Sequence, residues 1–259
     1  QLIRPLANPL MGGHWKGKTL QFGLVAEDVV SIRYFFYSKR GECNSDSFSP
    51  QHGDEYSLLV DVCLDKTYQF GDVWGWEAVF EKAEEVLLAY LIQIEKTDGN
   101  THFVMDPYAR ESSGGEQWGT PLSFEVDLEG LKLRVCSRPH GSIFPGLRRL
   151  PLLRPESSGD EAIETRPVHP QHSLEESIVY ECHLRGMTRG HSGSELNFQY
   201  PGTYKGLVEC IPYLKSLGVT AIELLPVFDF DENEKTCAAE NEQDLLNYWG
   251  YSPLLFFAP

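Results

Sequence analysis

The sequence is poor in features that whole classes of protein require. No apolar run approaches the roughly 18 residues that a membrane-spanning helix needs, so a transmembrane protein is excluded. Only 22 lysines and arginines stand against 38 aspartates and glutamates, a formal net charge of −16, which argues against nucleic acid or an anionic membrane as a partner. A neutral ligand such as a sugar is compatible with this charge.

Paired cysteines are also missing. The six cysteines are scattered singly, with no C-x-x-C pair and no histidine at zinc-ligand spacing. They are therefore expected to be reduced, mostly buried thiols, and neither a metal nor another cofactor is expected. No Asn-x-Ser/Thr acceptor occurs, which favours an intracellular or organellar protein. The chain opens on Gln1 without signal-peptide or transit-peptide character, which indicates that something upstream was removed or lies outside the sequence.

What is present is a chain of 259 residues, 41% hydrophobic and 23% charged, as in a folded protein of one large or two medium domains. Its first half contains short runs rich in β-branched and aromatic residues, separated by turn residues. These expected strands are 20–25, 29–37, 56–62, 73–80, 87–95, 101–105, 123–127 and 131–136. They predict an antiparallel β-sandwich over residues 1–136. The strand at 87–95 is favoured over a helix, because only its beginning has helical composition.

The pattern changes after the sandwich. Residues 137–174 are rich in proline, histidine and serine with little apolar periodicity, which indicates a linker. Beyond it, residues 178–184 are typical of a strand, and residues 204–217 carry a helical apolar stripe that ends at Gly218. The nearly continuous apolar run 219–225 predicts a strand buried on both faces of a parallel sheet. Together these segments predict a βαβ unit.

An acidic loop, residues 229–240, is one candidate for chemistry. It places carboxylates and an amide at positions 1, 3, 5 and 12 of an EF-hand calcium loop, but Glu234 stands where the sharp turn needs glycine. A solvated acidic loop without calcium is therefore expected. Glycoside hydrolysis needs two carboxylates about 5 to 9 Å apart across the sugar, and nothing in this loop places a pair in that way.

Two further groups of side chains carry polar or aromatic chemistry. Glu181, His183 and Arg185 alternate along the predicted strand and share one face, where structural hydrogen bonding is favoured over direct chemistry. The aromatic run 247–259 contains rings that could stack on the apolar face of a sugar. Periodicity alone favours core packing for these rings.

Four ordered blocks carry a resemblance to a known family. They are residues 180–188 (YECHLRGMT), 201–206 (PGTYKG), 211–228 (IPYLKSLGVTAIELLPVF) and 247–259 (NYWGYSPLLFFAP). Together they resemble isoamylase-type starch and glycogen debranching enzymes, which belong to the alpha-amylase clan of glycoside hydrolases. Residues 20–37, 71–74 and 104–109 look, more weakly, like the immunoglobulin-like glycan-binding module that precedes the barrel in this family.

The resemblance implies a division of the chain and a role for one residue. Residues 1–136 would be the immunoglobulin-like sandwich, and residues 175–259 the N-terminal part of an incomplete (β/α)₈ catalytic barrel. Tyr251 matches the family tyrosine that stacks on the glucose bound at the cleavage point, and the ligand would be a branched α-glucan, starch or glycogen. The family's three catalytic carboxylates belong to later barrel strands. No catalytic residue is therefore assigned, and this chain alone is expected to be inactive.

The parent enzyme implied by the resemblance cleaves α-1,6 branch linkages by a retaining two-carboxylate mechanism. The alternative is a noncatalytic glucan-binding or regulatory isoamylase-like subunit. Either would be compatible with an oligomer of the same or other isoamylase-like subunits. The expected location is the plastid in a plant or alga and the cytoplasm otherwise.

Overall fold

The structure is a computed structural model and describes residues 3–39, 55–80, 88–112, 123–128, 131–136, 150–153, 172–190, 198–233 and 246–258. The chain forms two compact units. The first contains residues 1–161, 228–247 and 252–259, and the second contains residues 162–227 and 248–251. We describe each unit by itself.

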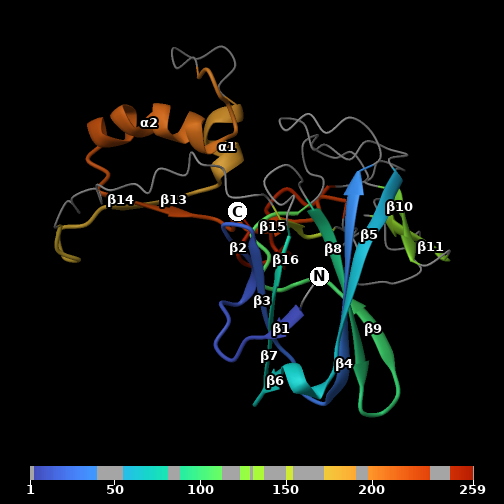
Figure 1. Cartoon of the computed structure of the whole chain (residues 1–259). Coiled ribbons are helices and arrows are strands. Elements are labelled where there is room, and N and C mark those ends of the chain that lie inside the picture. The colour runs from blue at the N-terminus through green and yellow to red at the C-terminus, as the bar shows by residue number, and fades with distance from the viewer. Residues whose placement is uncertain are drawn as a thin grey trace. The chain divides into compact units, whose positions relative to one another are not determined.

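Strands make up the described part of the first unit, apart from one 3₁₀ turn (Figure 1). In chain order its elements are β1 (Ile3–Pro5), β2 (Gly12–Lys16), β3 (Thr19–Val25), β4 (Val29–Lys39), β5 (Glu55–Leu64), η1 (Lys66–Tyr68), β6 (Gln69–Phe70), β7 (Val73–Val79), β8 (Leu88–Lys96), β9 (Thr101–Val104), β10 (Ser123–Leu128), β11 (Leu131–Cys136), β12 (Leu152–Leu153), β15 (Asp229–Phe230) and β16 (Pro253–Leu255). All eight strands that the sequence predicts in this region are confirmed.

The strands of the first unit form two large sheets and one small one. The first sheet has the order β1-β7-β3-β2 with β6 beside β7, and the second has the order β11-β10-β5-β4-β8-β12 with β9 beside β8. Their described pairs are antiparallel except β5 with β10, which is parallel. Strand β12 falls inside the predicted linker and pairs with β8. Strands β15 and β16 form a separate antiparallel pair.

An aromatic core lies between the two large sheets. Phe22 of β3 and Trp76 of β7 belong to the first sheet, and Tyr34, Phe36 and Tyr90 belong to the second; all five are fully buried. The ring of Phe22 stacks on Trp76 with 5.2 Å between centroids and lies 4.9 Å from the ring of Tyr34. Each buried aromatic ring removes roughly 150–250 Å² from water, so these five rings make a large contribution to the hydrophobic stabilisation of this unit. The predicted β-sheet domain is confirmed.

A pair of glycines lets the N-terminal segment cross the outer face of the first sheet. Gly23 of β3 and Gly75 of β7 are register partners. The backbone N–H of Leu6 donates to the carbonyl oxygen of Gly75 at 3.0 Å. A Cβ atom at Gly75 would collide with the carbonyl oxygen of Leu6. Only glycine allows the two backbones to approach this closely.

Asp106 places a buried carboxyl group in the first unit. Asp106 is 1% exposed and accepts hydrogen bonds from the Tyr90 hydroxyl at 2.8 Å and from the backbone N–H of Tyr108 at 2.9 Å. Burial raises the pKa of Asp106 above its ordinary value, because the charged form is deprived of water. The core therefore contains a titratable group whose charge opposes folding.

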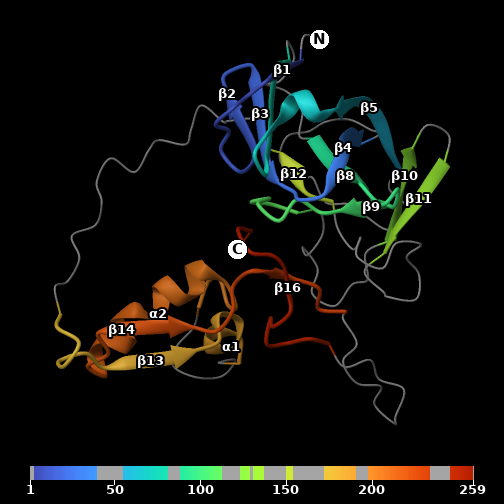
Figure 2. The same ribbon diagram turned by 90° about the horizontal axis from the view of Figure 1, so that it is seen from below.

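The second unit is a βαβ arrangement (Figure 2). Its elements are β13 (Val179–Cys182), α1 (Leu184–Arg189), α2 (Tyr204–Ser216) and β14 (Ala221–Leu224). Strands β13 and β14 pair in parallel over their full length. Helix α2 buries Leu207, Cys210 and Leu214 against half-buried neighbours that include Leu224. The predicted βαβ unit is confirmed.

Threonine and glycine define the two ends of α2, and the glycine end is the one that the sequence predicts. Thr203 is the N-cap, and its hydroxyl accepts a hydrogen bond from the backbone N–H of Gly206 at 3.2 Å. Gly218 follows the helix with φ of +83°, the left-handed conformation that glycine adopts without strain. The helix therefore begins and ends within one residue of the predicted stripe.

Two predictions for this unit are wrong. The strand predicted at 178–184 ends at Cys182, because His183 caps a short helix that begins at Leu184. The strand β14, predicted to be buried on both faces, has three exposed residues of four. In the described part of the chain only β13 pairs with β14, and its buried contacts are on the side of α2.

Three described cysteines take part in no disulfide bond, and Cys63 is the exposed one. Cys63, Cys182 and Cys210 are free, and Cys182 and Cys210 are buried. Within the described ranges no helix is long and apolar enough to cross a membrane. Nor does any group of three or more His, Cys, Asp or Glu side chains among the described residues have an arrangement that could hold a metal ion.

Candidate functional site

The carboxyl ends of the two parallel strands define one edge of the second unit. The backbone N–H of Leu225 donates to the carbonyl oxygen of Cys182 at 3.0 Å, which continues the pairing of β13 with β14 to their last residues. His183 follows at once. Folds with parallel strands place their ligand sites in the loops after these carboxyl ends. His183 therefore lies where a ligand site is expected in such a fold.

His183 makes a hydrogen bond through each ring nitrogen. Its Nδ1 accepts from the backbone N–H of Gly186 at 3.0 Å, as the N-cap of α1, and its Nε2 lies 2.8 Å from the carbonyl oxygen of Tyr248. An amide N–H can only donate and a carbonyl oxygen can only accept. The ring is therefore neutral and carries its proton on Nε2. This bond joins two segments that lie 65 residues apart in the sequence.

Stacking reinforces the same contact. The ring of Tyr248 lies on the imidazole of His183, with 4.6 Å between centroids and 19° between planes. The rings of Trp249 and His183 lie nearly perpendicular, with 6.5 Å between their centroids. Residues 248–251, which we call the aromatic segment, are thus attached to the carboxyl end of β13 by one hydrogen bond and two ring contacts.

The aromatic segment exposes large rings to solvent. Tyr248 is 41% exposed, Trp249 is 58% exposed and Tyr251 is 55% exposed. Between the last two lies Gly250, buried and with φ of +79°, a turn that side chains rarely adopt. Exposed aromatic faces beside hydrogen-bonding groups are suited to the apolar face of a sugar ring. The arrangement therefore offers a stacking surface for a carbohydrate.

The buried thiols behind this site are not reactive groups. Cys182 of β13 and Cys210 of α2 are buried, and burial raises the pKa of both thiols. A thiol must be deprotonated to act as a nucleophile or a metal ligand. These two cysteines therefore contribute packing rather than chemistry.

The structure places the residues singled out from the sequence in different surroundings. Tyr251, the candidate stacking residue, is exposed in the aromatic segment. The core packing expected of the C-terminal aromatic rings is wrong for Trp249 and for Phe256 and Phe257, which are more than half exposed. Leu255 of this stretch is fully buried and packs with Ala258 and Ala109 of the first unit.

The alternation of Glu181, His183 and Arg185 on one strand face is also wrong, because Arg185 belongs to α1. The preference for structural hydrogen bonding at His183 is confirmed by its two bonds. Sequence reasoning missed the partner of those bonds. The only local signal was the three-residue spacing between His183 and Gly186, whose backbone N–H is the donor that an N-cap side chain accepts from.

The acidic loop is buried where the structure describes it. Asp231, Glu232 and Asn233 are 1%, 5% and 8% exposed, so the expected solvated loop is wrong for these three residues. The Asp231 carboxylate accepts from the backbone N–H of Asn233 at 3.0 Å, and the carbonyl oxygen of Glu232 accepts from the backbone N–H of Asn247 at 2.8 Å. These bonds hold a turn. Glu234 and Glu240 lie outside the described residues.

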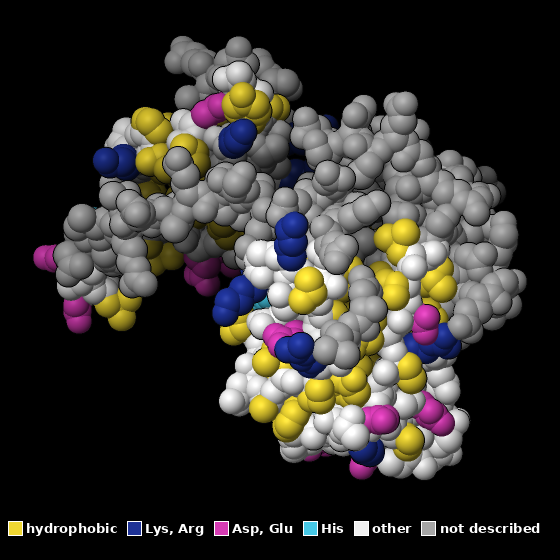
Figure 3. Space-filling view, viewed as in Figure 1, with side chains coloured by type: hydrophobic (Ala, Val, Ile, Leu, Met, Phe, Trp, Pro, Cys, Tyr) yellow, Lys and Arg dark blue, Asp and Glu magenta, His cyan; other side chains and the backbone are white. Residues whose placement is uncertain are grey.

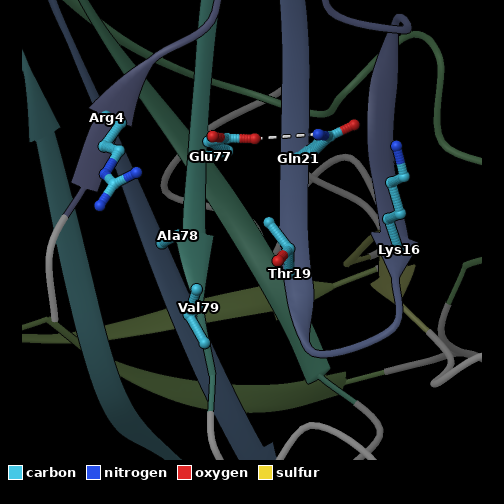
Figure 4. Close-up of a pocket in the computed structure, with 7 residues that line it drawn as sticks. All are labelled: Arg4, Lys16, Thr19, Gln21, Glu77, Ala78 and Val79. Atoms are coloured by element: carbon cyan, nitrogen blue, oxygen red, sulfur yellow. Dashed lines mark hydrogen bonds between the residues drawn. The ribbon is translucent and has the colours of Figure 1, made fainter.

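A hollow lies on the outer face of the first sheet (Figure 4). It has a volume of about 440 Å³ and is lined by Arg4, Lys16, Thr19, Gln21, Glu77, Ala78 and Val79. Across its middle, Gln21 donates to the Glu77 carboxylate at 2.9 Å. None of these seven lining residues is aromatic. The hollow is polar, and the aromatic segment is the better candidate for a sugar.

Comparison with known proteins finds isoamylases among the relatives of this chain. No protein-family model matches the chain. Isoamylase 3, chloroplastic, from Oryza sativa subsp. japonica is 44% identical over 213 residues, 80% of this chain and 24% of that protein. An isoamylase from Flavobacterium sp. is 39% identical over 193 residues, 73% of this chain and 23% of that protein. Isoamylase 1, chloroplastic, from the same rice is 34% identical over 163 residues, 61% of this chain and 16% of that protein.

Solved structures show the same architecture. The pullulanase from Paenibacillus barengoltzii superposes with a TM-score of 0.59 at 18% identity, over 96% of this chain and 31% of that one. The Group B Streptococcus pullulanase SAP, solved with maltotetraose, gives a TM-score of 0.57 at 19% identity, over 97% of this chain and 28% of that one. At these identities the likeness establishes the fold alone.

The fold is therefore that of part of a glycoside hydrolase of the pullulanase and isoamylase kind. The chain itself is a relative of the isoamylase-type debranching enzymes, as its four sequence blocks indicate. It spans 16% to 24% of the length of the three isoamylases named above.

Proposed function

We propose that this chain is part of an isoamylase-like glycoside hydrolase whose complete protein cleaves α-1,6-glucosidic branch linkages of starch or glycogen. The observation that carries the proposal is the aromatic segment attached to His183 at the carboxyl end of β13, with Trp249 and Tyr251 exposed. The isoamylase relatives and the pullulanase solved with maltotetraose support it. In this proposal Tyr251 stacks on a glucose unit of the chain's branched α-glucan ligand.

The finer architecture belongs to the same proposal. Residues 1–136 are an immunoglobulin-like sandwich of the glycan-binding type, residues 137–174 a linker, and residues 175–259 the N-terminal part of a (β/α)₈ barrel. The parallel pair of β13 and β14, joined through α2, is the repeating unit of such a barrel. The exposed residues of β14 are those that further barrel elements would cover.

The catalytic carboxylates of the family lie outside this chain in our proposal. A retaining glycosidase needs one carboxylate as nucleophile and another as acid and base, roughly 5 Å apart. In our proposal neither role is assigned to Asp231, whose carboxylate holds a turn, or to its buried neighbour Glu232. The chain by itself is accordingly inactive, while the complete protein performs the hydrolysis.

Partners and location follow from the same relationship. The net charge of −16 suits a neutral glucan and neither nucleic acid nor an anionic membrane. Association with identical or other isoamylase-like subunits is compatible with this role. The location is the plastid in a plant or alga, and the cytoplasm otherwise, in line with the chloroplastic and bacterial relatives.

Glucan binding can be measured by titrating maltohexaose into the 259-residue chain. We expect Tyr251→Ala to remove one stacking contact worth about 1 kcal/mol, which raises Kd roughly fivefold. Tyr213→Ala is the matched control, because Tyr213 is 41% exposed and lies near the C-terminal end of α2. That end of the helix is followed by Gly218, which lies close to Ile178 just before β13. Tyr213 is therefore near the opposite end of β13 from the aromatic segment. Equal losses in the two variants would contradict the stacking role.

Hydrolysis is tested separately. The purified chain incubated with amylopectin is expected to release no linear chains, and release of such chains would overturn its assigned inactivity. The same chain expressed with the natural continuation of its coding sequence is expected to debranch amylopectin. Absence of activity in that longer protein, with glucan binding retained, would favour the noncatalytic subunit instead.

A further inference from the structure

One side chain connects the end of β13, the start of α1 and the aromatic segment. His183 uses Nδ1 for the helix and Nε2 for the carbonyl oxygen of Tyr248, and its ring face contacts the Tyr248 ring. All of these atoms belong to the second unit. Both ring nitrogens and one ring face are therefore engaged at a single point of the fold.

We propose that His183 is a positioning residue for glucan binding: its neutral imidazole holds Tyr248 so that Trp249 and Tyr251 present their rings to the sugar. This inference rests on the proposed glucan-binding role of the aromatic segment. His183 itself is not assigned a contact with the glucan. It acts through the backbone of Tyr248.

The surroundings of Tyr248 make its position specific. A Cβ atom added to Gly186 would lie 3.1 Å from the Tyr248 hydroxyl, so this hydroxyl lies against the first turn of α1. The backbone carbonyl and the ring of Tyr248 are held by His183 at 2.8 Å and 4.6 Å. Three parts of one residue thus contact the α1 terminus, and a shift of Tyr248 would break all three contacts.

Such an anchor is needed because the segment contains its own hinge. Gly250 separates Trp249 from Tyr251 and adopts a left-handed turn. Glycine loses more conformational freedom on ordering than any other residue. A binding surface that is ordered before the ligand arrives avoids that cost at the moment of binding. Attachment at Tyr248 fixes one side of this hinge in advance.

Two substitutions separate the two hydrogen bonds of His183. His183→Asn places an amide oxygen close to the position of Nδ1 and so keeps an acceptor for Gly186, but it loses the donor to Tyr248. His183→Gln places an amide N–H near the position of Nε2 and so keeps a donor to Tyr248, but it loses the helix cap. The pair distinguishes positioning of the segment from stability of the helix.

The two His183 variants are expected to rank in opposite order for glucan affinity and for thermal stability. For maltohexaose we expect His183→Asn to raise Kd by roughly fivefold, the factor of one lost hydrogen bond, and His183→Gln to raise it by about twofold. Thermal unfolding is expected to be affected more by His183→Gln. If affinity falls in the same order as stability, His183 is merely structural and the inference is overturned.

A second measurement needs no glucan. With 5-fluorotryptophan incorporated, the ¹⁹F resonance of Trp249, assigned through Trp249→Phe, reports the order of the segment. We expect the resonance to narrow and shift in His183→Asn and to stay near its original position in His183→Gln. An unchanged resonance in His183→Asn would overturn the positioning role. If the unmodified chain binds no maltohexaose, the proposed function fails, and the ¹⁹F result still decides the role of His183.

Discussion

The two units bury their apolar side chains to very different degrees. In the first, rings such as Tyr34 and Trp76 are completely buried between two sheets. In the second, Val179 of β13 is 53% exposed and Ile222 of β14 is 36% exposed. Hydrophobic side chains are visible on the surface of this βαβ unit in Figure 3. The candidate site thus lies in the unit with the smaller core, while the larger core belongs to the unit without it.

The largest effect is expected from Trp76→Ala in the first unit. Removing a fully buried ring that stacks on Phe22 at 5.2 Å is expected to lower the free energy of unfolding by about 3–5 kcal/mol. Denaturant unfolding followed by near-UV circular dichroism measures it. Val79→Ala, on the same strand but 54% exposed, is the control and is expected to change stability by less than about 0.5 kcal/mol. Similar losses in both variants would mean that the core does not dominate this unit.

A smaller effect is expected from Leu214→Ala in the second unit. Leu214 is 2% exposed on α2, but its neighbours are only partly buried, so a loss of about 2 kcal/mol is expected, at the low end for leucine. The ¹⁹F resonance of Trp249 in protein labelled with 5-fluorotryptophan follows the unfolding of this unit. Val208→Ala, 62% exposed on the same helix, should leave the transition almost unchanged. A cost for Leu214→Ala above that of Trp76→Ala would reverse the contrast between the units.

The N-cap of α2 is expected to contribute less to stability than the side chain of Leu214. Thr203→Ala removes the hydroxyl that accepts from the backbone N–H of Gly206 at 3.2 Å, and the expected loss is about 1 kcal/mol. Thr203→Ser retains the cap oxygen and serves as the control. A cost shared equally by the two variants would show that the methyl group, rather than the hydrogen bond, stabilises the helix start.

The smallest effect is expected on the pH dependence of the stability of the first unit. The raised pKa of Asp106 means that its contribution to stability is fully present below the unfolded pKa of about 4 and is lost as pH rises through the folded value. Asp106→Asn is expected to remove this loss, because an amide cannot ionise. Urea unfolding of both proteins between acid and neutral pH measures the difference.

Asp98, whose pKa is shifted in the opposite direction, is the control. Hydrogen bonds from the backbone and side chain of Asn100 lower the pKa of the exposed Asp98 carboxyl. Its contribution is therefore present above the unfolded pKa and lost as pH falls through the folded value. Asp98→Asn should remove some stability at neutral pH and none at acid pH. Parallel pH profiles for the Asp98 and Asp106 variants would contradict both assignments.

Local patterns predicted the long elements well and the short ones poorly. The alternating aromatic and β-branched residues of β4 and β8 predict strands, and the stripe Leu207, Cys210 and Leu214 predicts α2. The strands β6 and β12 have two residues each, too few for any periodicity to appear. The predicted strand 178–184 runs into the start of helix α1 at Leu184, because the helix is capped by a histidine, an unusual cap residue.

Burial was less predictable than secondary structure. The apolar run of β14 predicts a strand with two covered faces, yet burial depends on what packs against the strand, and the described part of the chain supplies only β13 and α2. Acidic side chains predict exposure for Asp231 and Glu232, yet a hydrogen-bonded turn and a contact with Asn247 bury them. In both places distant residues decide the outcome.

Composition, periodicity and four sequence blocks were sufficient to predict a domain of β-sheets, a βαβ unit and a relationship to isoamylases, because each depends on residues close together in the chain or on short matched strings. They also indicated Tyr251. The attachment of the aromatic segment to His183 was decided by tertiary structure alone, since the hydrogen bond joins residues 65 positions apart. No local pattern encodes such a pair, because the two residues come together only in the folded second unit.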